Sequence, residues 1–155
     1  MESKEKIDEI GWRILTVLQQ NARINFAELG RQVGLSAPAV AERVKRLEDR
    51  GIITGYQAQV DRAKLGYGLT AFIRLRCSRD NYRRLDIVVN EMAEVLECHH
   101  VTGEDAFILK VIASSIPHLD EVITRLSPYG ATISAIVLST RTEGKPVARP
   151  APAGA

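Results

Sequence analysis

The spacing of apolar residues changes from helical to alternating near residues 61–68, and this change constrains the fold of the 155-residue chain more than any other feature. Before it, apolar residues such as Ile7, Ile10 and Ile14 recur at the spacing of one face of an α-helix. After it, apolar and polar residues alternate from residue 69 to residue 77, as in a half-buried β-strand. The sequence therefore predicts two small modules, a helical one followed by one built around strands.

Helix-capping residues predict where the helices of the first module begin and end. A first helix is expected over residues 8–20, and Asn25 precedes a glutamate at capping-box spacing, which marks the start of a second. Ser36 can accept a hydrogen bond from a first-turn amide of a third helix, Pro38 fits a position that needs no amide donor, and Gly51 ends that helix. The turn VGLS between the second and third helices lets them cross steeply, as in a helix-turn-helix.

The third helix combines an apolar face with a front of small residues and a cationic rear. Val40, Val44 and Leu47 have helical spacing and are predicted to pack against the first two helices. Alanines at the front can approach base edges in a DNA major groove, and the cations behind them can reach phosphates. Acidic residues partly cancel these cations, so a solvated helix face is the alternative. The alternating residues 52–60 predict a strand or wing, which favours DNA binding.

The second module shows the order βαββαβ. Its helical stripes and alternating segments predict strands and helices over 68–78, 82–92, 95–102, 106–113, 116–130 and 131–139. This order is that of a ferredoxin-like sandwich, in which two helices cover one face of a four-stranded antiparallel sheet. The predicted fold class is therefore α+β, with a winged helix-turn-helix over residues 1–60, a ferredoxin-like domain over 61–140 and a tail over 141–155.

The other face of the predicted sheet lacks a cover. Strands with apolar residues on both faces cannot leave one face in water, and a partner subunit is the simplest cover. A symmetric dimer also supplies two DNA-reading helices, suited to half-sites about 34 Å or a multiple of it apart. Arg74 and Arg76 lie on one face of the first strand, where we expect them to meet carboxylates of the partner subunit; an anion site is the alternative.

Several classes of protein are disfavoured by the sequence. The formal net charge of +2 indicates no particular partner by itself. The charged start MESKEKIDEI lacks the apolar region of a signal peptide, and no apolar run approaches the length of a membrane span, so we expect a cytoplasmic protein without membrane contact. Acylphosphatases share the topology of the second module, but the chain has no Ser–His–Asp order, phosphate loop or metal-ligand spacing, so we expect no enzyme.

Neither a metal nor a cofactor is expected. Cys77 and Cys98 lack the spacing of a metal or redox site and are interpreted as packing residues. His99 and His100 are adjacent on a strand, so they point to opposite faces and cannot share one metal ion. The tail over 141–155 is rich in proline and alanine without periodicity and is predicted to be disordered.

Three separated segments carry a resemblance to a known family. They read ILTVLQQNARINFAELGRQVGLSAPAVAERVKRLEDRGIITGYQAQVD, HHVTGEDAFILKV and IVLST. In order and spacing the chain closely resembles the Lrp/AsnC family, the feast/famine regulators, from about Ile7 to Thr140. The resemblance implies a transcription regulator that binds double-stranded DNA through a winged helix-turn-helix. It also implies a C-terminal ligand-binding domain, dimers that commonly assemble into octamers, and a response to an amino acid or related metabolite.

The resemblance places a recognition helix within residues 36–46. It implies DNA contact for Ser36, Ala37, Pro38, Glu42, Arg43 and Arg46. Apart from the arginines, few of these side chains can make bidentate base contacts. We therefore expect much of the selectivity to come from DNA shape and bending, at a degenerate A/T-rich site.

The resemblance also places an effector pocket at the turn TGEDAF and the start of the last strand, ATISA. The implied effector-binding residues are Gly103, Glu104, Asp105, Ala106, Thr132 and Ser134. Backbone amides can bind a carboxylate there and the polar side chains an amino group, but glycine and acidic residues also suit a hairpin turn without a ligand. Leucine-responsive members tend to carry an acid where Ala106 stands, which disfavours leucine. An architectural DNA-binding protein without an effector is the alternative.

Overall fold

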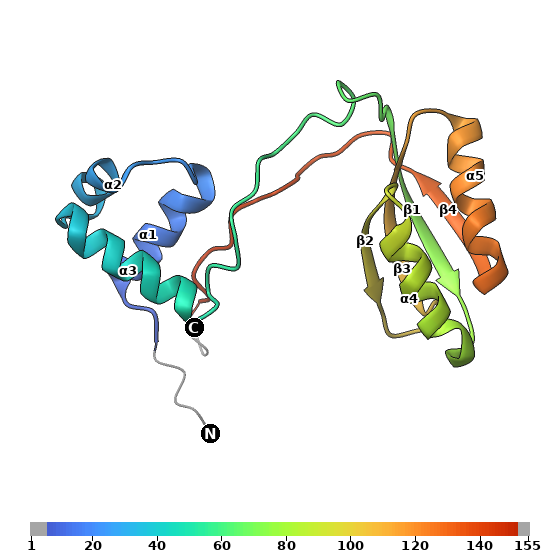
Figure 1. Ribbon diagram of the computed structural model, residues 1–155, viewed down its shortest axis with the longest axis horizontal. Helices are drawn as coiled ribbons and strands as arrows, with labels where there is room; N and C mark the ends of the chain where they lie inside the picture. The colour runs from blue at the N-terminus through green and yellow to red at the C-terminus, as the bar shows by residue number, and fades with distance from the viewer. Residues whose placement is uncertain (1–5, 152–155) are drawn as a thin grey trace. The chain divides into compact units, whose positions relative to one another are not determined.

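Residues 6–151 are described by the computed structural model, and their contacts divide the chain into two units. The first unit comprises the residues up to Ala58 and returns at Thr142, and the second comprises Gln59–Arg141. The first unit holds the helices α1 (Glu9–Gln20), α2 (Phe26–Val33) and α3 (Ala37–Asp49), drawn in blue to cyan in Figure 1. The chain therefore crosses between the units twice.

Each helix of the first unit begins at a residue whose side chain caps it. Asp8 accepts a hydrogen bond from the Gly11 amide at 2.8 Å at the start of α1. Asn25 accepts one from the Glu28 amide at 2.8 Å, and Ser36 caps the start of α3 in the same way. These side chains satisfy amide donors that have no partner inside the helix. The helix starts predicted after Asn25 and Ser36 are confirmed.

The strand or wing predicted over residues 52–60 is wrong. A bend follows Gly51, and residues 54–60 belong to no helix or strand. Tyr56 and Val60 on this segment are 49% and 62% exposed, so its alternation buries no face. A strand needs a neighbour for its amides and carbonyls, and the described part of the first unit holds no strand with which it could pair.

The second unit is a four-stranded antiparallel sheet with two α-helices. In chain order its elements are β1 (Leu69–Arg76), the 3-10 helix Arg79–Asn81, α4 (Tyr82–Glu91), β2 (Val95–His100), β3 (Phe107–Ala113), α5 (Ile116–Leu126), the 3-10 helix Ser127–Tyr129 and β4 (Ala131–Ile136). The strands are ordered β2-β3-β1-β4, and each neighbouring pair is antiparallel. This is the ferredoxin-like arrangement that the sequence predicts.

The alternation of β1 separates a covered face of the sheet from an open one. Ala71, Ile73 and Leu75 are buried in a core that also contains residues of α4 and α5. Phe72, between them, is 41% exposed, and Ile133 of β4 is 55% exposed. Ile133 stands opposite Arg74, and residues directly opposite each other share a face. This open face, defined by Phe72, Arg74, Arg76, Ile108 and Ile133, lies on the side away from the helices.

Candidate DNA-binding helix and ligand-binding turn

One face of helix α3 packs in the core of the first unit, and the opposite face is exposed to solvent. Val40, Val44 and Leu47 are at most 5% exposed and pack in one cluster with residues of α1 and α2. Of the six residues predicted to contact DNA, Ser36, Pro38, Glu42 and Arg46 are exposed, whereas Ala37 and Arg43 are half-buried. The structure therefore brings all six onto one short segment whose opposite side is fixed in the core.

The turn between α2 and α3 requires two glycines. Gly34 ends α2 with φ 77°, a backbone conformation that favours glycine, and its amide donates to the Gly30 carbonyl at 2.8 Å. The Leu35 amide donates to the same carbonyl at 2.9 Å. A Cβ atom on Gly30 would lie under 3.0 Å from the backbone oxygen of Leu35. Gly30 is not among the residues predicted from the sequence, although a glycine inside a helical pattern is a signal of close packing.

Arg43, predicted to contact DNA, is bound to the start of α1. Its Nη1 donates to both carboxylate oxygens of Asp8, at 3.0 and 2.8 Å. The Arg43 hydrogen bond and the Gly11 amide hold the pKa of Asp8 below its usual value. Arg46, by contrast, pairs with Glu42 on its own helix, at 2.8 Å, and remains largely exposed. A hollow of about 200 Å³ beside Asp8 is lined by Arg43, Arg46 and Arg50, which give this side of the unit positive charge.

We expect Asp8→Asn to lower the stability of the first unit at neutral pH by less than about 1 kcal/mol, because both partners are substantially exposed. Asparagine also caps helices, so mainly the ionic contact is lost. Because folding lowers the pKa of Asp8, its contribution is complete above the unfolded-state pKa and disappears as the pH falls through the folded-state pKa. Urea unfolding followed by Trp12 fluorescence should therefore separate the variant from the parent at pH 7, and the difference should shrink steadily as the pH is lowered below the ordinary pKa range of an aspartate. Asp49→Asn, which removes a charge at the exposed end of α3, serves as control.

The predicted ligand turn is fastened to β1. Gly103 has φ 113°, a backbone conformation that glycine adopts readily in a tight turn and other residues avoid. Glu104 pairs with Arg76 at 2.6 Å, and Asp105 pairs with Arg74 at 3.5 Å. Within the chain, the hairpin thus brings two acids beside the arginines of β1, and the contact expected with carboxylates of a partner subunit stays a prediction.

The remaining predicted effector residues lie differently. Ala106 is 9% exposed, belongs to the core, and donates its amide to the Leu75 carbonyl at 3.0 Å. Thr132 and Ser134 stand opposite Leu75 and Ile73, whose side chains lie on the covered face. The structure thus brings the six residues to the two sides of β1, but it places Thr132 and Ser134 on the opposite face from the Arg74 and Arg76 ion pairs.

The cysteines and histidines serve packing and hydrogen bonding. Cys77 and Cys98 are free thiols packed against the core, and burial raises the pKa of both. His99 contacts Glu97 at 3.1 Å, and the ring of His100 packs against aromatic side chains of the core. Within residues 6–151, no group of three or more potential metal ligands comes together. No helix in that range is long and apolar enough to span a membrane.

Comparisons with known proteins match both units. The family model of the AsnC-type helix-turn-helix domain matches residues 7–48, and that of the Lrp/AsnC ligand binding domain matches residues 70–147. The HTH-type transcriptional regulator LrpC of Bacillus subtilis is 31% identical over 86% of this chain and 93% of its own length. The solved structure of B. subtilis LrpC has a TM-score of 0.85, covering 88% of this chain and 98% of that one.

A second solved structure is a transcriptional regulator of Neisseria meningitidis in complex with L-methionine. It is 31% identical, has a TM-score of 0.85, and covers 92% of this chain and 96% of its own. The similarity therefore extends over both units and the segments that join them.

Proposed function

Because the chain belongs to the Lrp/AsnC family of helix-turn-helix transcriptional regulators, we propose that it regulates transcription by sequence-selective DNA binding that an amino acid or related small metabolite modulates. Family membership already makes it a DNA-binding regulator with a ligand-binding domain and not an enzyme. The observation that carries the proposal is helix α3, whose apolar face is buried while Ser36, Pro38 and Arg46 remain exposed.

The open face of the sheet supports a dimer as the working form. Phe72 and Ile133 are large apolar side chains at 41% and 55% exposure on one face, with charged residues of β1 beside them. Exposed apolar patches bordered by polar groups are typical of subunit interfaces. A two-fold dimer through this face provides two copies of α3, and further assembly of dimers is part of the proposal.

The ligand turn supports an amino-acid effector through its charges. An amino acid carries a carboxylate and an ammonium group, and the turn offers an opposite charge to each. Arg74 can bind the carboxylate, and Asp105 can bind the ammonium group. Their own ion pair is long, at 3.5 Å, and half of the Arg74 side chain is exposed. The N. meningitidis relative solved with L-methionine makes this class of ligand a natural starting point. We propose a ligand that separates Arg74 from Asp105.

A second candidate function, architectural DNA binding without an effector, is favoured by the same ion pairs. Glu104 and Asp105 already have cationic partners, and Ala106 is buried in the core. A turn that satisfies its own charges needs no ligand. The two functions differ in whether any amino acid changes DNA binding.

The test is selection of genomic DNA fragments by the purified protein at fixed salt, followed by titration with a panel of amino acids. We expect a few sites, and one amino acid that shifts the affinity by about fivefold or more, as typical allosteric couplings do. Asp105→Asn should abolish the shift and retain DNA binding, whereas Asp80→Asn, a change outside this turn, should retain both. Broad binding that ignores every amino acid would favour the architectural function instead.

A further inference from the structure

A pocket of about 430 Å³ lies on the first unit, and DNA binding as described above does not use it. Its walls come from α1, including Trp12, Leu15 and Leu18, and from the segment 52–57. The six residues predicted to contact DNA are not among its lining residues. One lining residue comes from far along the chain: Val147, in the segment predicted to be a disordered tail.

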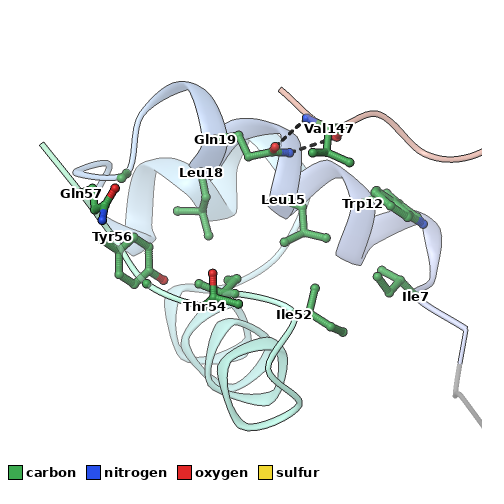
Figure 2. Close-up of a pocket in the computed structure, with 13 residues that line it drawn as sticks. Ile7, Trp12, Leu15, Leu18, Gln19, Ile52, Thr54, Tyr56, Gln57 and Val147 are labelled. Atoms are coloured by element: carbon green, nitrogen blue, oxygen red, sulfur yellow. Dashed lines mark hydrogen bonds between the residues drawn. The ribbon is translucent and has the colours of Figure 1, made fainter. Parts of the chain in front are cut away.

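The Gln19 side chain makes hydrogen bonds with both the backbone amide and the backbone carbonyl of Val147. The side-chain amide nitrogen donates to the Val147 carbonyl at 3.1 Å, and the side-chain oxygen accepts from the Val147 amide at 2.7 Å. Figure 2 shows the Gln19 side chain extending from α1 to the backbone of Val147 through these two bonds. A primary amide that gives and takes one hydrogen bond reproduces the pairing that a neighbouring strand offers an extended chain.

Two further features fit the segment to this place. Arg149 donates to Glu9, at the start of α1, at 2.7 Å, so contacts lie at both ends of that helix. Pro146 and Pro150 flank the contacting residues, and proline restricts the unfolded chain, which lowers the entropy lost when the segment docks. Residues 137–151 form no helix or strand, in keeping with the composition of a tail, yet Val147 and Arg149 have defined partners on α1.

We propose that this pocket is a docking site for residues 145–149 of the same chain, and that docking makes the C-terminal segment a second tether between the two units. The first connection leaves the DNA-binding unit after Ala58, and the second returns from β4, whose Ile133 stands opposite Arg74 of the proposed ligand site. A ligand that displaces β4 therefore has a covalent route to α1. This last step rests on the proposed function, whereas the docking itself does not.

The contacts suit a reversible tether. The Val147 side chain remains 71% exposed, and the Arg149–Glu9 pair is exposed on both sides, so polar contacts rather than buried area hold the segment. Such contacts are weak individually and suffice only because the segment is attached, which gives it an effective concentration on the order of millimolar. Docking can therefore be released by a modest change in the path of the chain after β4.

Amide hydrogen exchange of the full-length protein tests the docking directly, without DNA or ligand. Gln19→Ala should accelerate exchange at the Val147 amide by about tenfold, the factor that corresponds to one ordinary hydrogen bond. Gln20→Ala, which removes the neighbouring amide side chain of α1, should leave that exchange unchanged. A Val147 amide that exchanges in the parent protein as fast as in an unstructured peptide would overturn the proposal. Protection that depends on protein concentration would place the segment of a second copy in the pocket and overturn the tether within one chain.

A pair of proline variants gives a second readout. Val147→Pro removes the donor to Gln19, whereas Ala148→Pro adds the same ring one residue later and retains that donor. Trp12 is the only tryptophan of the chain and lines the pocket, so its emission reports on occupancy. Val147→Pro should shift the emission to longer wavelength, and Ala148→Pro should not. A synthetic peptide of residues 142–151, added at millimolar concentration to the Val147→Pro protein, should reverse the shift. Equal emission from both variants would contradict the docking.

Discussion

Replacing Gly30 by alanine is expected to destabilise the first unit by about 1–3 kcal/mol or more, the range found when atoms are forced into a packed site. The added Cβ meets the backbone oxygen of Leu35 at under 3.0 Å, and a backbone atom cannot rotate away as a side chain can. The Gly30 carbonyl also accepts the amides of Gly34 and Leu35, so a shift of the turn disturbs both hydrogen bonds. Alanine would gain the usual helix propensity, about 1 kcal/mol, which is too little to offset the clash.

The measurement is urea unfolding followed by Trp12 fluorescence, with DNA affinity as a second readout. Because the turn sets the angle at which α3 leaves α2, the variant should also bind DNA more weakly under conditions in which it remains folded. Gly68→Ala is the control, since a Cβ there meets nothing within 4 Å. If Gly30→Ala and Gly68→Ala unfold at the same urea concentration, the close approach of Gly30 to Leu35 is not a constraint on the fold.

The elements that the sequence predicted correctly are those determined by local chemistry. Caps such as Asn25 and Ser36 act within one turn of helix, and the alternation of β1 depends only on which side of the sheet each residue faces. The strand order followed because the element order βαββαβ leaves few compact topologies. These inferences need no knowledge of distant residues.

The features that sequence reasoning missed depend on residues distant along the chain. The Arg43–Asp8 contact joins positions 35 residues apart, and the Gln19–Val147 contact joins positions 128 apart. No local pattern links such pairs, because only the folded backbone brings them together. The prediction of a strand or wing over residues 52–60 was wrong for a related reason. Alternation indicates a strand only where a neighbouring strand satisfies the backbone amides and carbonyls. The division of the predicted effector residues between two faces became visible only with the strand register, which places Thr132 opposite Leu75.

Replacing Arg46 by alanine is expected to weaken DNA binding by about 1.5–3 kcal/mol, roughly tenfold to 150-fold, the range of a hydrogen bond to a charged group, with little effect on folding. Arg46 is exposed and lies beyond the front of α3, where a cation reaches phosphate rather than a base edge. Its ion pair with Glu42 is exposed on both sides, so losing it costs little stability. Arg43 is a poorer test, because its removal also breaks the contact with Asp8.

A phosphate contact and a base contact leave different signatures in the same titrations. If Arg46 binds phosphate, the loss of affinity is uniform across DNA sequences. The slope of the logarithm of affinity against the logarithm of salt concentration then becomes shallower by about one, because one phosphate contact is lost. Arg83→Ala removes the same charge from the exposed side of α4 in the other unit, so it corrects for the change in net charge. An unchanged salt slope with a loss confined to particular sequences would assign Arg46 to base recognition. A loss no larger than that of Arg83→Ala would remove Arg46 from the interface and move the DNA-contacting part of α3 toward Ser36 and Pro38.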